Sequence, residues 1–150
     1  GDDPAIYTAQ ERYEGYAKAL KQAKFPIDKK LVLRGLASEE EAIAEVRKVL
    51  RNENAPTAIY ATQNLLTWVA MKALRAENLE EKVALVGFDE LPGAELLRPA
   101  VTLVKQNLAE MGRRSIEMLF NRINGDTSKY QTEVLQTTLT PMGSGEIKAR

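Results

Sequence analysis

The sequence contains no cysteine and no histidine, and the two absences exclude much of the usual chemistry of enzymes. Without cysteine the chain forms no disulfide and has no thiol nucleophile, a composition that suits the cytoplasm. Without histidine it lacks the commonest general base and the commonest metal ligand. The sequence also has no phosphate-binding loop and no metal-ligand spacing. We therefore expect no enzymatic activity, no cofactor and no bound metal.

The chain also lacks an excess of one charge and a long apolar run. Its 21 basic and 21 acidic residues cancel, so no net field attracts nucleic acid. No stretch is long enough to span a membrane, and no signal peptide is present. A length of 150 residues and a hydrophobic content of 44% suit one domain with a sizeable core. We expect a cytoplasmic protein in which these residues bind neither membrane nor DNA.

A continuous apolar run from 83 to 88 organises the rest of the sequence. It shows no alternation of apolar and polar residues, which is typical of a strand buried on both faces in a parallel sheet. The run ends at Asp89, and a second predicted strand, 101–105, ends at Gln106. The carboxyl ends of parallel strands open on the crevice where such sheets bind ligands. The pattern predicts a polar pocket suited to a polyol or sugar.

Shorter strands and helices are predicted on either side of this run. Strands are expected at 31–33, 57–61 and 132–140. Two helices are expected to begin with capping boxes, at Thr8 and at Ser38, and a third is expected from 65 to 76. Residues 1–4, Gly-Asp-Asp-Pro, are typical of the loop that follows a strand, and that strand is not in the sequence.

The segment VGFDELPGAELLRPAVTLVKQNLAEMGRR closely resembles the effector-binding core of LacI/GalR-type bacterial transcription regulators. Their pattern is a strand ending in Val-Gly-Tyr/Phe-Asp-Asp, a short helix, a proline, then Leu-Thr-Thr-Val-x-Gln and Met/Leu-Gly. The resemblance implies an α/β fold, a three-layer, parallel-sheet lobe of the periplasmic-binding-protein-like type I class. In that fold 1–106 would form the C-terminal lobe, 107–124 a helix crossing to an N-terminal lobe that these residues lack, 131–140 a returning strand, and 141–150 a loose tail.

The resemblance also implies four ligand-binding residues. Arg12 matches an Arg-x-x-Gly-aromatic pattern whose arginine holds ligand hydroxyls or a carboxylate, although a solvated arginine is the alternative. Gln63 stands where the family usually has an asparagine that contacts the effector. Asp89 and Gln106 occupy the tips of the two strands. Glu90, on the opposite side of an extended chain from Asp89, is assigned to the loop.

The chain departs from the family pattern at Leu36 and Ala37, where an aromatic residue often stacks on a sugar ring. Trp68 has two interpretations. It either belongs to the core or, as the resemblance implies, lies on a homodimer face with Leu96 and Leu97.

The predicted helix 107–124 carries an apolar stripe without a partner in these residues. Leaving about five such side chains in water would forfeit about 1.5–3 kcal/mol each. We therefore expect the helix to pack onto its own sheet or onto a second chain.

Together these features favour the effector-sensing and dimerisation portion of a LacI/GalR-type regulator. In such a protein a small molecule, a sugar or a related metabolite, controls DNA binding by an N-terminal headpiece that these residues do not include. With one wall of the cleft present, we expect this chain to bind effector weakly. The alternative is a sugar-binding receptor of a transport system, which shares the two-lobed architecture and usually works as a monomer.

Overall fold

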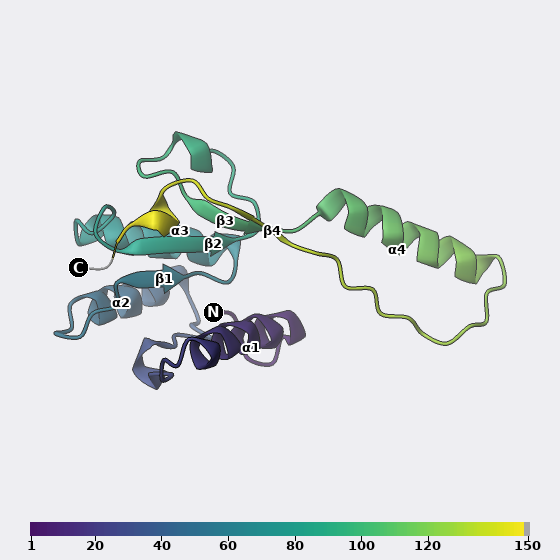
Figure 1. Ribbon diagram of the computed structural model, residues 1–150, viewed down its shortest axis with the longest axis horizontal. Helices are drawn as coiled ribbons and strands as arrows, with labels where there is room; N and C mark the ends of the chain where they lie inside the picture. The colour runs from purple at the N-terminus through teal and green to yellow at the C-terminus, as the bar shows by residue number, and fades with distance from the viewer. Residues whose placement is uncertain (149–150) are drawn as a thin grey trace.

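The computed structural model describes residues 1–148, which form a four-stranded sheet flanked by helices and one arm that projects away from it (Figure 1). The elements in chain order are α1 (Tyr7–Gln22), η1 (Lys29–Leu31), α2 (Glu39–Leu50), β1 (Ala58–Tyr60), α3 (Asn64–Ala76), β2 (Ala84–Phe88), η2 (Ala94–Leu96), β3 (Thr102–Lys105), α4 (Leu108–Ile123), β4 (Thr138–Thr140) and η3 (Ser144–Glu146).

The sheet has the strand order β1-β2-β3-β4. β1, β2 and β3 are parallel, in a register that pairs Ile59 with Leu85 and Gly87 with Leu103. β4 is antiparallel to β3 and pairs Thr140 with Leu103. The prediction of a parallel sheet is therefore confirmed for the three strands that carry the expected site, and their carboxyl ends share one edge of the sheet.

The core lies between the sheet and the helix pair α2–α3. β2 is buried on both faces, as its unbroken apolar run predicted, with only its middle residue half-buried. α3 contributes the apolar stripe that its spacing indicated, and α2 closes the cluster through its last residue, Leu50. The most deeply buried members are Ala70, Ala73, Leu74, Leu85, Ala94, Val101 and Leu103.

Two of the predicted local features do not form. α1 begins at Tyr7 with Ile6 at its N-cap and no side-chain cap, so the capping box at Thr8 is wrong. Residues 31–33 form no strand, because Leu31 ends the 3-10 helix η1, and Val32, although extended, has no ladder beside it. The capping box at Ser38 is confirmed, since its hydroxyl accepts a hydrogen bond from the Glu41 amide at 3.1 Å. Of the predicted strand 132–140, only 138–140 pairs with the sheet.

The expected loose tail is wrong for 142–146, because this segment is tied to the sheet. The buried Ser144 hydroxyl accepts from the Thr102 amide at 2.9 Å and donates to the Leu85 carbonyl at 2.6 Å. The Thr102 hydroxyl in turn accepts from the amides of Met142 and Gly145. These polar side chains satisfy backbone groups that the sheet leaves open, a role that hydrophobic periodicity does not reveal. Residues 149 and 150 of the predicted tail lie outside the described residues.

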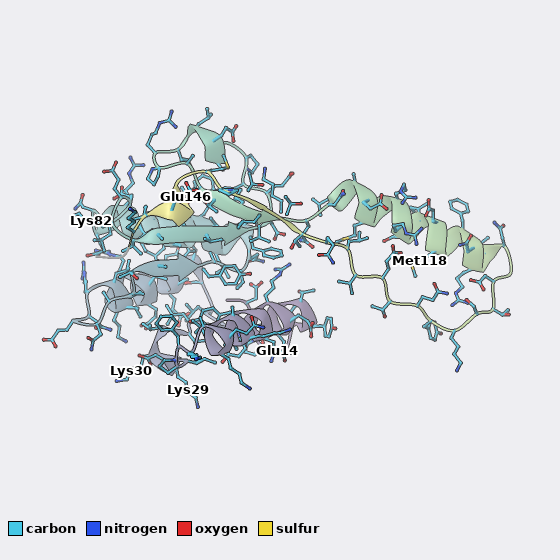
Figure 2. The ribbon with its side chains drawn as sticks, in the orientation of Figure 1. Glu14, Lys29, Lys30, Lys82, Met118 and Glu146 are labelled. Atoms are coloured by element: carbon cyan, nitrogen blue, oxygen red, sulfur yellow. The ribbon has the colours of Figure 1, made fainter. Side chains whose placement is uncertain are left out.

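α4 forms, but it packs on no part of the sheet. It projects from the carboxyl end of β3, and Figure 2 shows Met118 well away from the sheet. None of its residues is buried, and five of its large apolar side chains are more than half exposed: Leu108, Ile116, Leu119, Phe120 and Ile123. The expectation that the helix packs onto its own sheet is therefore wrong. Packing onto another chain or lobe stays a prediction.

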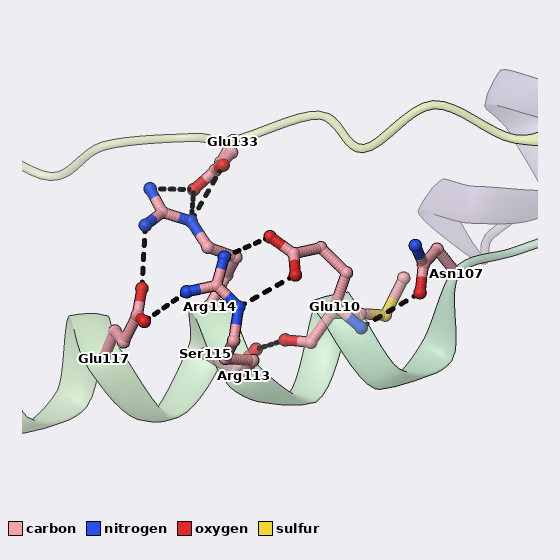
Figure 3. A network of polar contacts seen from close by, with 8 residues as sticks. Asn107, Glu110, Arg113, Arg114, Ser115, Glu117 and Glu133 are labelled. Carbon is pink, nitrogen blue, oxygen red and sulfur yellow. Dashed lines mark hydrogen bonds and ion pairs between the residues drawn. The ribbon is translucent and has the colours of Figure 1, made fainter.

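Ion pairs link the returning segment to α4 (Figure 3). Nε of Arg114 donates to both carboxylate oxygens of Glu133, at 2.9 and 2.8 Å. The same guanidinium donates to Glu117 at 2.8 Å, and Arg113 bridges Glu110 and Glu117. All of these side chains are substantially exposed, so the pairs contribute little stability.

A second charged cluster joins α2 to the end of α3. The carboxylate of Glu77, which caps α3, accepts from Nε of Arg47 at 2.6 Å and from Nε of Arg51 at 2.9 Å. Hydrogen bonds from Arg51 and then Arg47 lower the pKa of Glu77 to about 2. The two guanidinium groups thus hold the carboxylate in its charged form and link the two helices that cover the sheet.

Replacing Ser144 with alanine is expected to destabilise the fold. The change would leave the Thr102 amide and the Leu85 carbonyl buried without partners, which costs about 1–3 kcal/mol. Urea denaturation measures the loss. Ser128→Ala is the matched control, because its exposed hydroxyl bonds only within its own turn, and its effect should stay within about 0.5 kcal/mol. Equal effects of the two substitutions would contradict the assigned role of Ser144.

Acid is expected to weaken the α2–α3 link through Glu77. Its folded pKa is lowered, so the stabilisation is complete above the unfolded value of about 4.3 and is lost as pH falls toward about 2. The Glu77→Gln variant should therefore lose less stability than the parent between about pH 6 and about pH 3, measured by urea midpoints. Glu81→Gln, at an exposed position, should keep the parent's pH dependence. An equal loss of stability in the parent and in Glu77→Gln would contradict the role assigned to the Glu77 carboxylate in joining α2 to α3.

Candidate ligand-binding site at the strand tips

The site begins where β2 ends and Asp89 turns the chain out of the sheet. Asp89 has a φ of 70°, in the left-handed region that aspartate tolerates better than most residues. Its amide donates to the Val104 carbonyl at 2.9 Å, which ties the tip of β2 to β3. The carboxylate is half-buried, whereas the neighbouring Glu90 is exposed, as expected for a loop residue.

Gln106, one residue beyond β3, contacts Asp89 directly. Its Nε2 donates a hydrogen bond to Oδ1 of Asp89. A carboxylate accepts such a bond strongly because of its charge. Within residues 1–148 no side chain other than Gln106 donates to this carboxylate, so its second oxygen can accept from an incoming hydroxyl. The two strand-tip residues predicted to act together are therefore in contact.

Arg12 reaches the same edge of the sheet from α1. Its Nη1 donates to the Thr62 carbonyl at 2.7 Å, just beyond β1. Its guanidinium carbon lies 3.9 Å from the centre of the Phe88 ring, at the tip of β2. No described carboxylate pairs with Arg12, so most of its five N–H donors remain available. This position fits a ligand contact better than a fully solvated arginine.

Tyr60, the last residue of β1, completes the cluster and was not singled out from the sequence. Burial raises the pKa of its phenol, the positive charge of Arg12 lowers it, and the negative charge of Asp89 raises it. Both charges therefore act on one hydroxyl, which stays protonated at neutral pH. The only sequence signal was a hydroxyl-bearing aromatic at the end of a predicted strand, and many strands carry one.

Gln63 takes a different place from the other three predicted residues. It is the N-cap of α3, and its backbone carbonyl accepts from the amide and the hydroxyl of Thr67, both at 2.9 Å. Its side chain makes no cap bond and no described hydrogen bond to Arg12, Asp89 or Gln106. It follows Thr62, whose carbonyl holds Arg12, so it flanks the cluster without touching it.

A cavity lies beside this cluster and borders it at Tyr60. It has a volume of about 690 Å³ and is enclosed by α1, the segment 31–39, α2, β1 and α3. Tyr60 and Gln63 line it together with Leu36 and Ala37, whereas Arg12, Asp89 and Gln106 do not. Arg12, Asp89 and Gln106 are instead half-buried at the edge of the sheet, where solvent reaches them.

The cluster has the composition of a hydroxyl-binding site. Arg12 supplies donors, Asp89 an acceptor with full charge, and Gln106 and Tyr60 groups that both donate and accept. The described residues contain no grouping of acidic side chains that could hold a metal ion. Among residues 1–148, no helix combines the length and apolar character needed to cross a bilayer.

The three residues predicted for a dimer face differ in exposure. Trp68 is 38% exposed and Leu96 is 77% exposed, so neither belongs to the core. Leu97 is half-buried and packs against the core cluster. The core interpretation of Trp68 is therefore wrong, and its place in an interface stays a prediction.

Charge changes around Tyr60 are expected to move its pKa in opposite directions. Arg12→Gln removes the positive charge and should raise the pKa further, whereas Asp89→Asn removes the negative charge and should lower it. NMR titration of ring-carbon-labelled tyrosine, with Tyr60 assigned through Tyr60→Phe, measures both shifts. Glu90→Gln is the control and should leave the value unchanged. Shifts in the same direction for the two variants would contradict this geometry.

Comparison with known proteins gives a consistent set of similarities. The model of the periplasmic binding protein-like domain matches residues 1–144. The HTH-type transcriptional repressor PurR of Haemophilus influenzae is 30% identical over 118 residues, covering 77% of this chain and 35% of that protein. A LacI-family regulatory protein of Chloroflexus aggregans superposes with a TM-score of 0.81 at 32% identity, covering 90% of this chain and 50% of the other.

The structure of a complex of the transcriptional regulator CelR with cellobiose gives a TM-score of 0.79 at 34% identity, covering 90% of this chain and 42% of the other. The chain spans 35–40% of the length of the curated relatives PurR and CelR. The similarity to LacI-type regulators that the segment from Val86 onward indicated is thus confirmed over most of the chain.

Proposed function

Since this chain belongs to the family of periplasmic binding protein-like domains, we propose that it is one lobe of the effector-sensing domain of a LacI/GalR-type transcription regulator. The relatives that support the proposal are described as transcriptional repressors and regulators of the HTH type. The DNA-binding headpiece would precede the lobe in a longer, cytoplasmic protein. The lobe itself would sense a small molecule and carry no catalytic step.

The hydrogen bond between Gln106 and Asp89 is the observation that carries the proposal. It joins the tips of two parallel strands at the edge where such sheets bind ligands. Arg12 lies close enough to act electrostatically with Asp89 on Tyr60. A sugar or related polyol would accept from Arg12 and donate to Asp89. Binding of cellobiose by the similar regulator CelR favours the same ligand class here.

Gln63 is proposed as a flanking contact for a larger ligand. Its side chain is free of cap bonding and half-buried at the start of α3. A carboxamide on this longer side chain can reach a second ring or substituent. No aromatic residue stands at Leu36 or Ala37 to stack on a sugar ring, so recognition would depend on hydrogen bonds.

We assign α4 to the boundary with the other lobe. Its exposed apolar stripe is large enough to require cover, since each buried side chain contributes about 1.5–3 kcal/mol. The helix leaves the sheet after β3, and the chain returns to it at β4. Residues 107–124 would therefore pack in the N-terminal lobe, while 131–140 returns to this one.

A homodimer is proposed on the face that carries Trp68 and Leu96. Both are exposed aromatic or aliphatic side chains of the kind that anchor interfaces, and Leu97 beside Leu96 is fixed by core packing. A dimer would also separate this reading from the alternative, a monomeric sugar receptor of a transport system. The relatives are described as transcription regulators, which favours the dimeric regulator over the monomeric receptor.

Calorimetric titration of a longer protein containing both lobes tests the proposal, with glucose, ribose and cellobiose as probes. One of these sugars should bind, and Asp89→Asn should weaken its affinity about 10- to 100-fold, because a hydrogen bond to a charged group is lost. Glu90→Gln, next to it but outside the cluster, should keep the parent's affinity.

The 150-residue chain alone should bind the same sugar far more weakly, since it supplies one wall of the cleft. Equal affinity of Asp89→Asn and Glu90→Gln would refute the assigned site. If sugar binding does not change the amount of genomic DNA that the longer protein retains, the alternative of a transport receptor would be favoured.

A further inference from the structure

Five exposed lysines gather where α1 ends and in the segment that follows it. We call them the basic patch: Lys18, Lys21, Lys24, Lys29 and Lys30. Figure 2 shows Lys29 and Lys30 at the outer edge of the molecule, below the sheet. Between residues 18 and 31 the five positive charges stand against one negative charge, that of Asp28, in a chain whose total charge is zero.

The positive charges of the basic patch are not neutralised within the described part of the chain. The lysines that pair with carboxylates there are Lys48 and Lys72, and no lysine of the patch does so. The carboxylate of Asp28 accepts a hydrogen bond from the Lys30 amide at 2.9 Å and caps η1. The patch is therefore a local source of positive potential that would attract an anionic partner.

The basic patch borders an open hollow with apolar walls, between the end of α1 and the segment 24–27. Phe25, Pro26 and Ile27 line this hollow together with the first three lysines of the patch. Phe25 is 65% exposed and Ile27 is 39% exposed, so water contacts both apolar side chains. Covering them with an apolar group of a partner would be favourable.

The backbone beside the hollow is held in a conformation that lysine does not favour. The amide of Phe25 donates to the Leu20 carbonyl at 2.9 Å and the amide of Lys24 donates to the Lys21 carbonyl at 3.1 Å, the two bonds of a Schellman cap. Lys24 has a φ of 60°, at the position where such caps usually carry glycine. Lysine at this position places a charge beside the hollow at a cost in stability, a combination that is typical of functional surfaces.

We propose that the basic patch docks an acidic segment of another protein, with one aliphatic or aromatic side chain of that segment in the hollow and its carboxylates on the surrounding lysines. The unpaired charge and the exposed apolar walls then serve the same partner. A flat bilayer surface has no projecting side chain to fill the hollow. A nucleic acid strand stacks on several aromatic rings and on arginine, whereas residues 18–31 contain one ring and no arginine. The inference is independent of the effector proposal, since it involves neither Asp89 nor Gln106.

NMR titration of the isotope-labelled 150-residue chain with the peptide EEELFEEE tests the proposal. The amides of Lys21, Lys24 and Phe25 should shift and saturate below about 1 mM peptide, the range of weak complexes. The amide of Leu85, in the core, should not shift. The peptide EEESSEEE keeps the charges and lacks the apolar pair, so it should bind at least about fivefold more weakly. Equal affinity of the two peptides would overturn the proposal, because the hollow would then contribute nothing.

Three variants separate charge at the patch from charge elsewhere. Lys21→Glu combined with Lys24→Glu should lower the affinity for EEELFEEE at least about tenfold. Lys82→Glu makes the same charge change at an exposed lysine that lies away from Lys29 and Lys30 (Figure 2), and should change the affinity by less than about twofold. Lys24→Gly should raise the urea midpoint, because glycine favours the left-handed backbone, and should still lower the affinity about two- to fivefold.

An affinity that both the double variant and Lys24→Gly leave unchanged would overturn the proposal, as would an equal loss in Lys82→Glu and the double variant. Tighter binding of an oligothymidylate of about twenty nucleotides than of EEELFEEE would assign the patch to nucleic acid and refute the acidic partner. Cosedimentation with vesicles of phosphatidylcholine and phosphatidylserine, abolished in the double variant, would assign it to a membrane surface and refute the proposal in the same way.

Discussion

The parallel backbone ladder that joins β1, β2 and β3 is the constraint on which the rest of the structure depends. It brings the ends of three separate strands to one edge of the sheet. There Gln106 is hydrogen-bonded to Asp89 and the charge of Asp89 acts on Tyr60, although 46 residues separate Tyr60 from Gln106. Without the ladder, contacts between these side chains would not bring them together, because each contact contributes about 1–3 kcal/mol at most to stability. The hydrogen bond between Gln106 and Asp89 is a consequence of strand order.

The ladder was predictable because its signal is local. An unbroken apolar run such as 83–88 fits a strand covered on both faces, and the spacing in 65–76 fits a helix lying on it. The polar residues that follow each strand could be named as candidates for the same reason. Of the four predicted residues, Asp89 and Gln106 are in contact, and the charges of Arg12 and Asp89 act on the Tyr60 hydroxyl. The position of Gln63 depends on how α3 begins, which the sequence pattern does not determine.

Other features depend on partners distant in sequence. Ser144 bonds to Thr102 and Leu85, 42 and 59 residues away, and nothing in a short polar tail indicates such a bond. Residues 31–33 look like a strand, yet a strand exists only where a neighbour accepts its hydrogen bonds. Tyr60 was missed because its importance comes from two charges on other elements, Arg12 and Asp89.

The register of β3 with β4 determines how the projecting arm is attached. Lys105, the last residue of β3, pairs with Thr138, the first residue of β4, so the chain leaves and re-enters the sheet at neighbouring points. The arm is therefore fastened to the sheet at two adjacent points on one pair of antiparallel strands. Gln106 is the first residue past one crossing, and its side chain is bonded to Asp89 on the sheet. The base of the arm and the cluster at the strand tips are therefore joined through this one side-chain hydrogen bond.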